Sequence, residues 1–109
     1  MSLAGERMSL RYVVGCRFAD AQVLERWVEW LEREHLADVC AAGALRAEIL
    51  RAEQESYVEV HYTFASREAF ATYERESAPR LREEGLRLFP LSLGLEYRRA
   101  TFDVQGHYP

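Results

Sequence analysis

The amino-acid sequence predicts a single α+β domain with the element order βαββαβ, in which two helices cover one face of a four-stranded antiparallel sheet. Three observations predict this fold class. Four segments alternate apolar and polar residues with the period of two that is typical of strands. Two longer segments repeat apolar residues at intervals of three and four, as amphipathic helices do. The 109 residues, 49% of them hydrophobic, suffice for one core and leave no room for a second.

The first strand and the first helix have the clearest patterns. The strand is predicted over residues 9–18, with these apolar side chains on one face: Tyr12, Val14, Cys16 and Phe18. Asp20 is expected to cap a helix whose apolar residues recur at helical spacing: Leu24, Trp27, Val28 and Leu31. We expect this helix to continue to about Ala42 with a break near His35. It should end at Gly43, because glycine readily adopts the left-handed conformation of a helix stop.

A hairpin follows the first helix. Strands are predicted over residues 44–52 and 56–65, and the polar residues 53–55 between them suit a short loop. Two consecutive strands joined in this way form an antiparallel pair.

A second helical region and a last strand complete the order. Ser66 is expected to cap a helix over residues 67–88 that bends at Pro79, since proline removes a backbone donor and clashes with the preceding turn. The last strand is predicted over residues 91–98, because leucines and Tyr97 alternate there with polar residues and glycine.

The ends of the chain have no periodic pattern. Residues 1–8 are interpreted as a disordered N-terminus or an expression scar, residues 9–104 as the folded domain and residues 105–109 as a mobile tail. The apolar runs are far shorter than the roughly 20 residues that cross a bilayer, and no basic stretch precedes an apolar one at the N-terminus. A cytoplasmic location without membrane contact is expected.

Beyond the element order, two stretches are familiar. The order βαββαβ on a chain of this length is that of a ferredoxin-like domain. Residues 34–43, EHLADVCAAG, and residues 78–84, APRLREE, resemble an uncharacterised bacterial family, known as a domain of unknown function, in the dimeric α/β-barrel superfamily. The similarity extends over residues 10–102. It implies a homodimer formed through the open sheet face rather than a reaction, because the superfamily includes cofactor-independent monooxygenases, small isomerases, haem-dependent enzymes and stress-induced proteins.

Charge and motif content argue against several function classes. All 14 basic residues are arginine, the net charge is −4, and the arginines of residues 80–87 alternate with glutamates instead of forming a basic patch, so no nucleic-acid partner is expected. No phosphate loop or nucleophile motif is present, and the three histidines lack metal-ligand spacing, so neither cofactor nor metal is expected. Cys16 and Cys40 are interpreted as buried, reduced thiols.

The candidate ligand-binding residues lie mainly on the open sheet face. Tyr57, Glu59 and His61 alternate on one side of the third strand, and Arg17 and Arg98 are expected beside them. Two interpretations remain open for this set. It is either a ring of ion pairs that fixes the register of the dimer, or a ligand site in which an arginine binds an acid and His61 or Glu59 moves a proton.

Two further features concern the helix side of the sheet. His35, at the expected helix break, is a second candidate, although a histidine near a helix end also hydrogen-bonds the last carbonyls. Four aromatic residues suit an aromatic pocket between sheet and helices, but their spacing is more typical of core: Trp27, Trp30, Tyr62 and Tyr73.

Two functions therefore stay open. The first is a non-enzymatic or small-ligand-sensing dimeric domain for a small anionic or phenolic molecule. The alternative is a cofactor-independent enzyme, monooxygenase-like or isomerase-like, that acts on a small acidic or aromatic compound with His35 or His61 as general base.

Overall fold

The computed structural model describes residues 9–109, so the predicted scar or disordered segment, residues 1–8, lies outside the described part. The order of elements is the predicted one, with the first helix divided by a π-helical turn and a short 3₁₀ turn before the last strand. The elements in chain order are β1 (Leu10–Phe18), α2 (Ala21–Trp30), the π-turn η1 (Leu31–His35), α3 (Leu36–Ala41), β2 (Arg46–Arg51), β3 (Tyr57–Phe64), α4 (Arg67–Glu76), α5 (Ala78–Leu88), the 3₁₀ turn η2 (Leu91–Leu93) and β4 (Leu95–Asp103).

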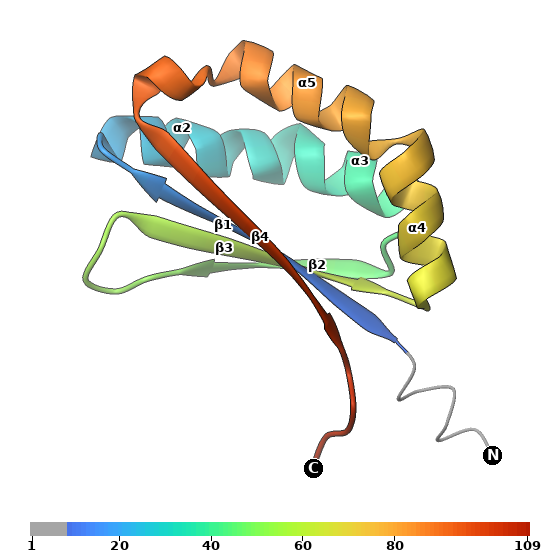
Figure 1. The fold of residues 1–109 in the computed structure, drawn as a ribbon. Helices are drawn as coiled ribbons and strands as arrows, with labels where there is room; N and C mark the ends of the chain where they lie inside the picture. Colours follow the sequence, from blue (N-terminus) through green and yellow to red (C-terminus); the bar gives the residue numbers. More distant parts are fainter. Residues whose placement is uncertain (1–8) are drawn as a thin grey trace, which may run out of the picture.

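The four strands form one antiparallel sheet in the order β2-β3-β1-β4. All helices lie over one face of this sheet, and β4 crosses the molecule as an edge strand beside β1 (Figure 1). Within residues 9–109, no helix covers the other face of the sheet. The predicted fold class is thus confirmed, including the open sheet face.

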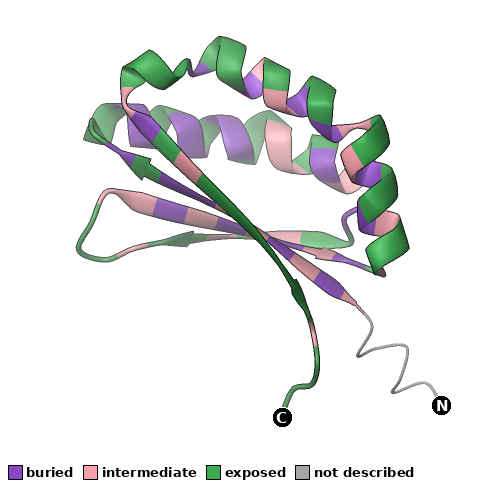
Figure 2. Cartoon of the chain, in the orientation of Figure 1, coloured by how far each residue is buried: buried purple, intermediate pink, exposed green. Residues whose placement is uncertain are grey.

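The core fills the space between the sheet and the helices (Figure 2). Along β3, buried and half-buried residues alternate without a fault, which is the period of a strand with one covered face. The apolar set of β3 faces the helices as predicted: Val58, Val60, Tyr62 and Phe64. Cys16 of β1 also faces the helices and is fully buried, and this burial raises the pKa of its thiol to about 12.

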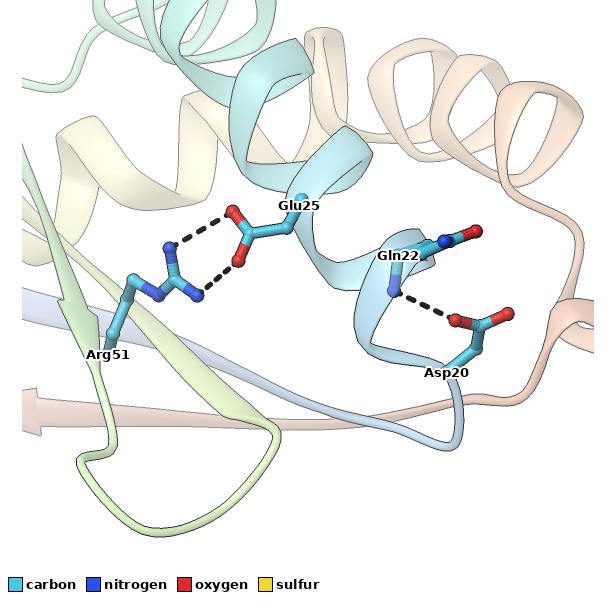
Figure 3. A network of polar contacts seen from close by, with 4 residues as sticks. All are labelled: Asp20, Gln22, Glu25 and Arg51. Atoms are coloured by element: carbon cyan, nitrogen blue, oxygen red, sulfur yellow. Dashed lines mark hydrogen bonds and ion pairs between the residues drawn. The ribbon is translucent and has the colours of Figure 1, made fainter.

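Helix α2 is fixed at both its beginning and its exposed side (Figure 3). The Asp20 side chain accepts a hydrogen bond from the backbone N–H of Gln22 at 2.8 Å, which confirms the predicted cap. Arg51 at the end of β2 donates two hydrogen bonds to Glu25, at 3.2 and 2.7 Å. This forked pair ties the hairpin to α2.

The predicted break near His35 is the π-turn η1. On an uninterrupted α-helix Val39 would lie roughly 80° around the axis from Leu31, away from the buried face. A π-turn accommodates one extra residue with hydrogen bonds between residues five apart. Leu31 and Val39 are consequently both buried. Helix α3 ends at Ala41, and the chain turns at Gly43 with φ of 135°, as predicted.

The second helical region divides where proline requires it. Ser66 caps α4 by accepting from the Ala69 N–H at 3.0 Å, and Pro79 lies in the first turn of α5, where its missing donor is harmless. Ser77 joins the two helices. Both predictions for this region are confirmed.

The prediction for the last strand was wrong at both ends. The strand was expected over residues 91–98, whereas β4 covers Leu95–Asp103. Leu91 and Leu93 instead belong to η2, which ends at Gly94 with φ of 90°. A leucine at every second position fits this short turn as well as a strand, and the left-handed glycine prevents the extended backbone from continuing.

The last residues and the helices carry two further findings. Residues 104–109 have no regular secondary structure, although the Val104 N–H donates to the Ser9 carbonyl at 2.9 Å. None of the helices in residues 9–109 is long and apolar enough to cross a bilayer.

Candidate functional site

The open sheet face brings together the predicted row of polar residues on β3. The Tyr57 hydroxyl donates to Glu59 Oε2 at 2.8 Å, and His61 Nε2 lies 2.9 Å from Glu59 Oε1. Both hydrogen bonds lower the pKa of the Glu59 carboxyl, and the one with His61 has the larger effect. The three side chains form a chain of polar groups in which each satisfies its neighbour.

A glycine on β1 makes room for this row. A Cβ atom at Gly15 would lie 2.2 Å from the Tyr57 hydroxyl, so only glycine allows the phenol to lie across the strand toward Glu59. Arg98 of β4 pairs with Gly15 in register and faces the same side. Together these residues line an open hollow of about 300 Å³.

Arg17 lies at the edge of this group and is already engaged. Its Nη1 contacts Glu55 Oε1 at 2.6 Å, and its guanidinium carbon lies 5.2 Å from the centroid of the Tyr57 ring. Arg17 is therefore beside the predicted row but bound to the hairpin loop.

The structure separates His35 from the other predicted site residues. It lies on the helix side of the sheet, where its ring stacks on Trp30 with centroids 4.4 Å apart and an interplanar angle of 24°. The π-turn produces this stack, because it brings residues five apart onto one face. Burial lowers the pKa of His35 to about 4, so the imidazole is neutral near pH 7.

Trp30 and His35 line a cavity between the sheet and the helices. We call it the helix-side cavity, and its volume is about 50 Å³. Its wall includes the four aromatic residues for which the sequence left two alternatives open, a pocket or the core: Trp27, Trp30, Tyr62 and Tyr73. The volume holds a few waters or one small group, and is smaller than the roughly 300 Å³ at which preformed ligand sites begin.

Two ring nitrogens at this cavity are buried without a hydrogen-bond partner within residues 9–109: Trp30 Nε1 and His35 Nδ1. Buried polar atoms are nearly always paired, so each exception calls for a water, an ion or a ligand. Arg11 Nε and Thr63 Oγ1 are also buried without a partner, but they face each other across the open side of β1 and β3. The open side is wide enough for a second protein chain, whereas the helix-side cavity has room only for small groups.

Two arginines contribute to the cavity wall. Arg82 of α5 is engaged, since it donates to the Tyr12 hydroxyl at 2.9 Å and to Glu74. Arg99 of β4 lies with its guanidinium carbon 4.9 Å from the centroid of the Tyr97 ring. In the described part of the chain no carboxylate lies within ion-pair distance of Arg99.

The sequence reasoning missed both arginines for identifiable reasons. The last strand was predicted to end at Arg98, so the next residue fell outside any element and had no assigned face. Arg82 was interpreted as part of an alternating charged helix surface. One signal was available in the sequence. Arg82 follows Leu81 directly and precedes Gly85 by three residues, and this spacing places its guanidinium at the border of the buried stripe.

Metal binding finds no support in the described residues. Within residues 9–109 no three His, Cys, Asp or Glu side chains lie close enough to hold a metal ion. The arrangement instead suits an organic ligand, because aromatic walls surround a few unpaired hydrogen-bonding atoms.

Comparison with known proteins agrees with the fold. The sequence profile of a domain of unknown function, DUF4286, matches residues 12–93. No curated protein matches the chain.

Solved structures with the same fold include enzymes and proteins without an assigned activity. A monooxygenase of Streptomyces coelicolor from the gene ActVA-Orf6, in complex with nanaomycin D, is 14% identical with a TM-score of 0.75 and covers 100% of this chain and 98% of its own. A dimeric ferredoxin-like protein from an uncultured marine organism is 15% identical, with a TM-score of 0.70 over 93% and 98% of the two chains. SnoaB, a cofactor-independent oxygenase from Streptomyces nogalater, is 13% identical, with a TM-score of 0.69 over 94% and 98%. These likenesses confirm the ferredoxin-like fold.

Proposed function

Because the chain belongs to DUF4286, a family of domains of unknown function, we infer its role from its own geometry and propose a homodimeric domain that binds a small aromatic molecule in the helix-side cavity. This is the small-ligand-binding role that the sequence favoured, with the ligand on the other side of the sheet from the predicted row.

The observation that carries the proposal is the pair of unpartnered ring nitrogens, Trp30 Nε1 and His35 Nδ1, at one aromatic-walled cavity. An indole N–H donates only, whereas a neutral imidazole nitrogen donates or accepts according to its tautomer. A phenol or a ring carbonyl satisfies both atoms, and its ring packs against the aromatic wall.

The open sheet face is proposed as the homodimer interface. Several solved proteins with this fold are described as dimeric. The face carries Val13 and the 55% exposed Phe102, and the unpaired atoms of Arg11 and Thr63 lie on it. A second sheet packed there covers the apolar residues and supplies partners for the polar ones.

The row of Tyr57, Glu59 and His61, together with Arg98 and Arg17, belongs to this interface in our proposal. The hydrogen bonds within the row are already complete, which favours a role in the register of two sheets over a role in ligand binding. A ligand in the 300 Å³ hollow between the sheets remains the competing proposal for these residues.

A second function, cofactor-independent oxygenation, is favoured by one specific feature. His35 is neutral near pH 7 and has a ring nitrogen without a partner in residues 9–109, so its imidazole is free to accept a proton, although its lowered pKa makes it a weaker base than an exposed histidine. Two proteins with this fold are described as a monooxygenase and a cofactor-independent oxygenase. Oxygen uptake in the presence of a bound phenol distinguishes this function from binding alone.

The binding proposal is tested by a thermal-shift screen of small phenols and hydroxybenzoates on the wild type, Trp30→Phe and His35→Gln. A ligand at 100 times its Kd stabilises the wild type by about 2.7 kcal/mol. Both variants should lose most of this gain, because each removes one of the unpaired nitrogens, while His61→Gln on the open face should keep it. Equal gains in all four proteins, or none in the wild type, contradict the proposal.

A further inference from the structure

We infer that the helix-side cavity selects aromatic ligands that carry an acidic group, and that Arg99 at its rim is the specificity-determining residue. This inference rests on the proposed function, since it names the chemical class of the ligand for the same cavity.

Besides tyrosine hydroxyls, which donate or accept, the cavity is lined by indole and guanidinium groups, which only donate. Trp30 Nε1 donates only, and the Arg99 guanidinium carries five donors and no acceptor. None of the described residues that line the cavity is an aspartate or a glutamate. A ligand that satisfies these groups must therefore present acceptor oxygens, and a negative charge among them is favoured by the cation.

The second arginine of the wall does not compete for that charge. Arg82 is already paired with Glu74 and hydrogen-bonded to Tyr12, both through Nη2, so its charge is compensated within the protein. Arg99 has no such partner in residues 9–109, and an arginine with free donors binds a carboxylate in a planar, two-pronged geometry.

The position of Arg99 is set by the strand and by an aromatic ring. It pairs with Val14 in register, which places it on the helix side of β4, and Tyr97 two residues earlier supports its guanidinium. The cation on the ring face is attracted to the π electrons, which restricts the side chain to the rim. Arg98, the preceding residue, faces the opposite side of the sheet at the open hollow.

The size of the cavity is consistent with a ligand that lies partly inside it and partly at its rim. About 50 Å³ accommodates an edge of one ring with its oxygen, and the remainder of the ligand lies at the rim. Because Arg99, Trp30 and His35 all line this cavity, we expect an acidic substituent next to a phenolic oxygen to contact Arg99 while the ring packs near Trp30 and His35. Salicylate has this arrangement, and its amide, salicylamide, has the same shape without the charge.

The test measures the Kd of salicylate and of salicylamide by calorimetry for the wild type, Arg99→Gln, Arg99→Lys and Arg98→Gln. The wild type should bind the acid at least about tenfold more tightly than the amide. Arg99→Gln should lose this preference but still bind the amide, and Arg99→Lys should keep part of it because a lysine retains the charge without the fork. Arg98→Gln is the matched control and should behave as the wild type, since its side chain lies across the sheet.

The outcomes separate the inference from the function on which it rests. Equal affinities of the wild type for acid and amide, or an unchanged preference in Arg99→Gln, overturn the selectivity while leaving the cavity as a binding site. If the wild type binds neither compound at millimolar concentration, the proposed function fails and the inference fails with it. Circular dichroism confirms that each variant is folded, which is expected because Arg98 and Arg99 are both exposed.

Discussion

Among single residues, His35 shows how far the position of one side chain depends on the fold around it. It lies five residues after the tryptophan on which it stacks, so its position depends on the π-turn between them. The sequence predicted a break there but not a π-turn, because a π-turn has no residue signature and is selected by the packing of both helical segments. The stack of His35 on Trp30 followed only from the three-dimensional arrangement.

The burial of His35 predicts how stability depends on pH. Its pKa is about 4 in the folded chain and about 6.5 when exposed, so the unfolded chain binds more protons between these values. The stabilisation is complete above pH 6.5 and is lost as the pH falls toward 4. In His35→Gln the difference in unfolding free energy between pH 7 and pH 4.5 should shrink by about 2 kcal/mol, as measured by urea denaturation.

His107→Gln serves as the control for this measurement, because His107 is exposed in the last residues of the chain. Parallel pH profiles for the wild type and His35→Gln, with no change in slope between pH 6.5 and 4.5, would show that His35 is not buried as a neutral ring.

At the scale of elements, most of the secondary structure was predictable and the end of the chain was not. Caps at Asp20 and Ser66, the helix stop at Gly43 and the division at Pro79 were correct, because each depends on local backbone chemistry. The position of β4 was wrong because alternating leucines do not distinguish a strand from a short turn. Because of that error the sequence assigned Arg99 to neither face of the sheet; its face is defined only by the pairing of β4 with β1.

The contact between α5 and α2 predicts the effect of a small substitution. In a free helix, Gly85→Ala would stabilise by about 1 kcal/mol through helix propensity. Here a Cβ atom at this position would lie 3.2 Å from Trp30 Cη2, so either the Trp30 ring or α5 has to shift slightly from its packed position. We expect the unfolding free energy to fall by about 1 kcal/mol in chemical denaturation.

A second background identifies the cause of that loss. In Trp30→Leu the contact is absent, and Gly85→Ala should there be neutral or stabilising. A gain of about 1 kcal/mol in the wild-type background would mean that the two helices are not in close contact at this point.

For the whole molecule, the two faces of the sheet have different roles. The helix side holds the core and a small, partly open cavity, while the open side holds a row of polar contacts beside exposed apolar residues. Sequence alternation predicted both faces and the row on β3. It left open whether the aromatic residues form a pocket or only core, because a cavity is what remains after side chains from seven elements have packed, and no local pattern records that remainder.

The open face predicts the oligomeric state. The wild type should have twice the 12.7 kDa mass of one chain in light scattering at micromolar concentration. Val13→Asp places a charge at the centre of the face and should give the mass of a single chain, because an unpaired charge is costly to bury.

Leu91→Asp is the matched control, since Leu91 is 56% exposed in η2, away from the sheet face. It should remain a dimer. A wild type with the mass of one chain, or a Val13→Asp protein that stays dimeric, would place the interface elsewhere.

The strand order has a consequence for how the protein is made. β1 precedes the other strands of the sheet in the chain and lies between β3 and β4, so one of its edges stays unpaired until Leu95–Asp103 have been synthesised. An unpaired edge is a template for pairing with other chains, and contacts between the two ends of a chain form slowly. The wall that contains Tyr97 and Arg99 is also the last to be added to the cavity. A ligand bound by this wall therefore stabilises only chains in which β4 has been made and paired, and it does not stabilise chains truncated before β4.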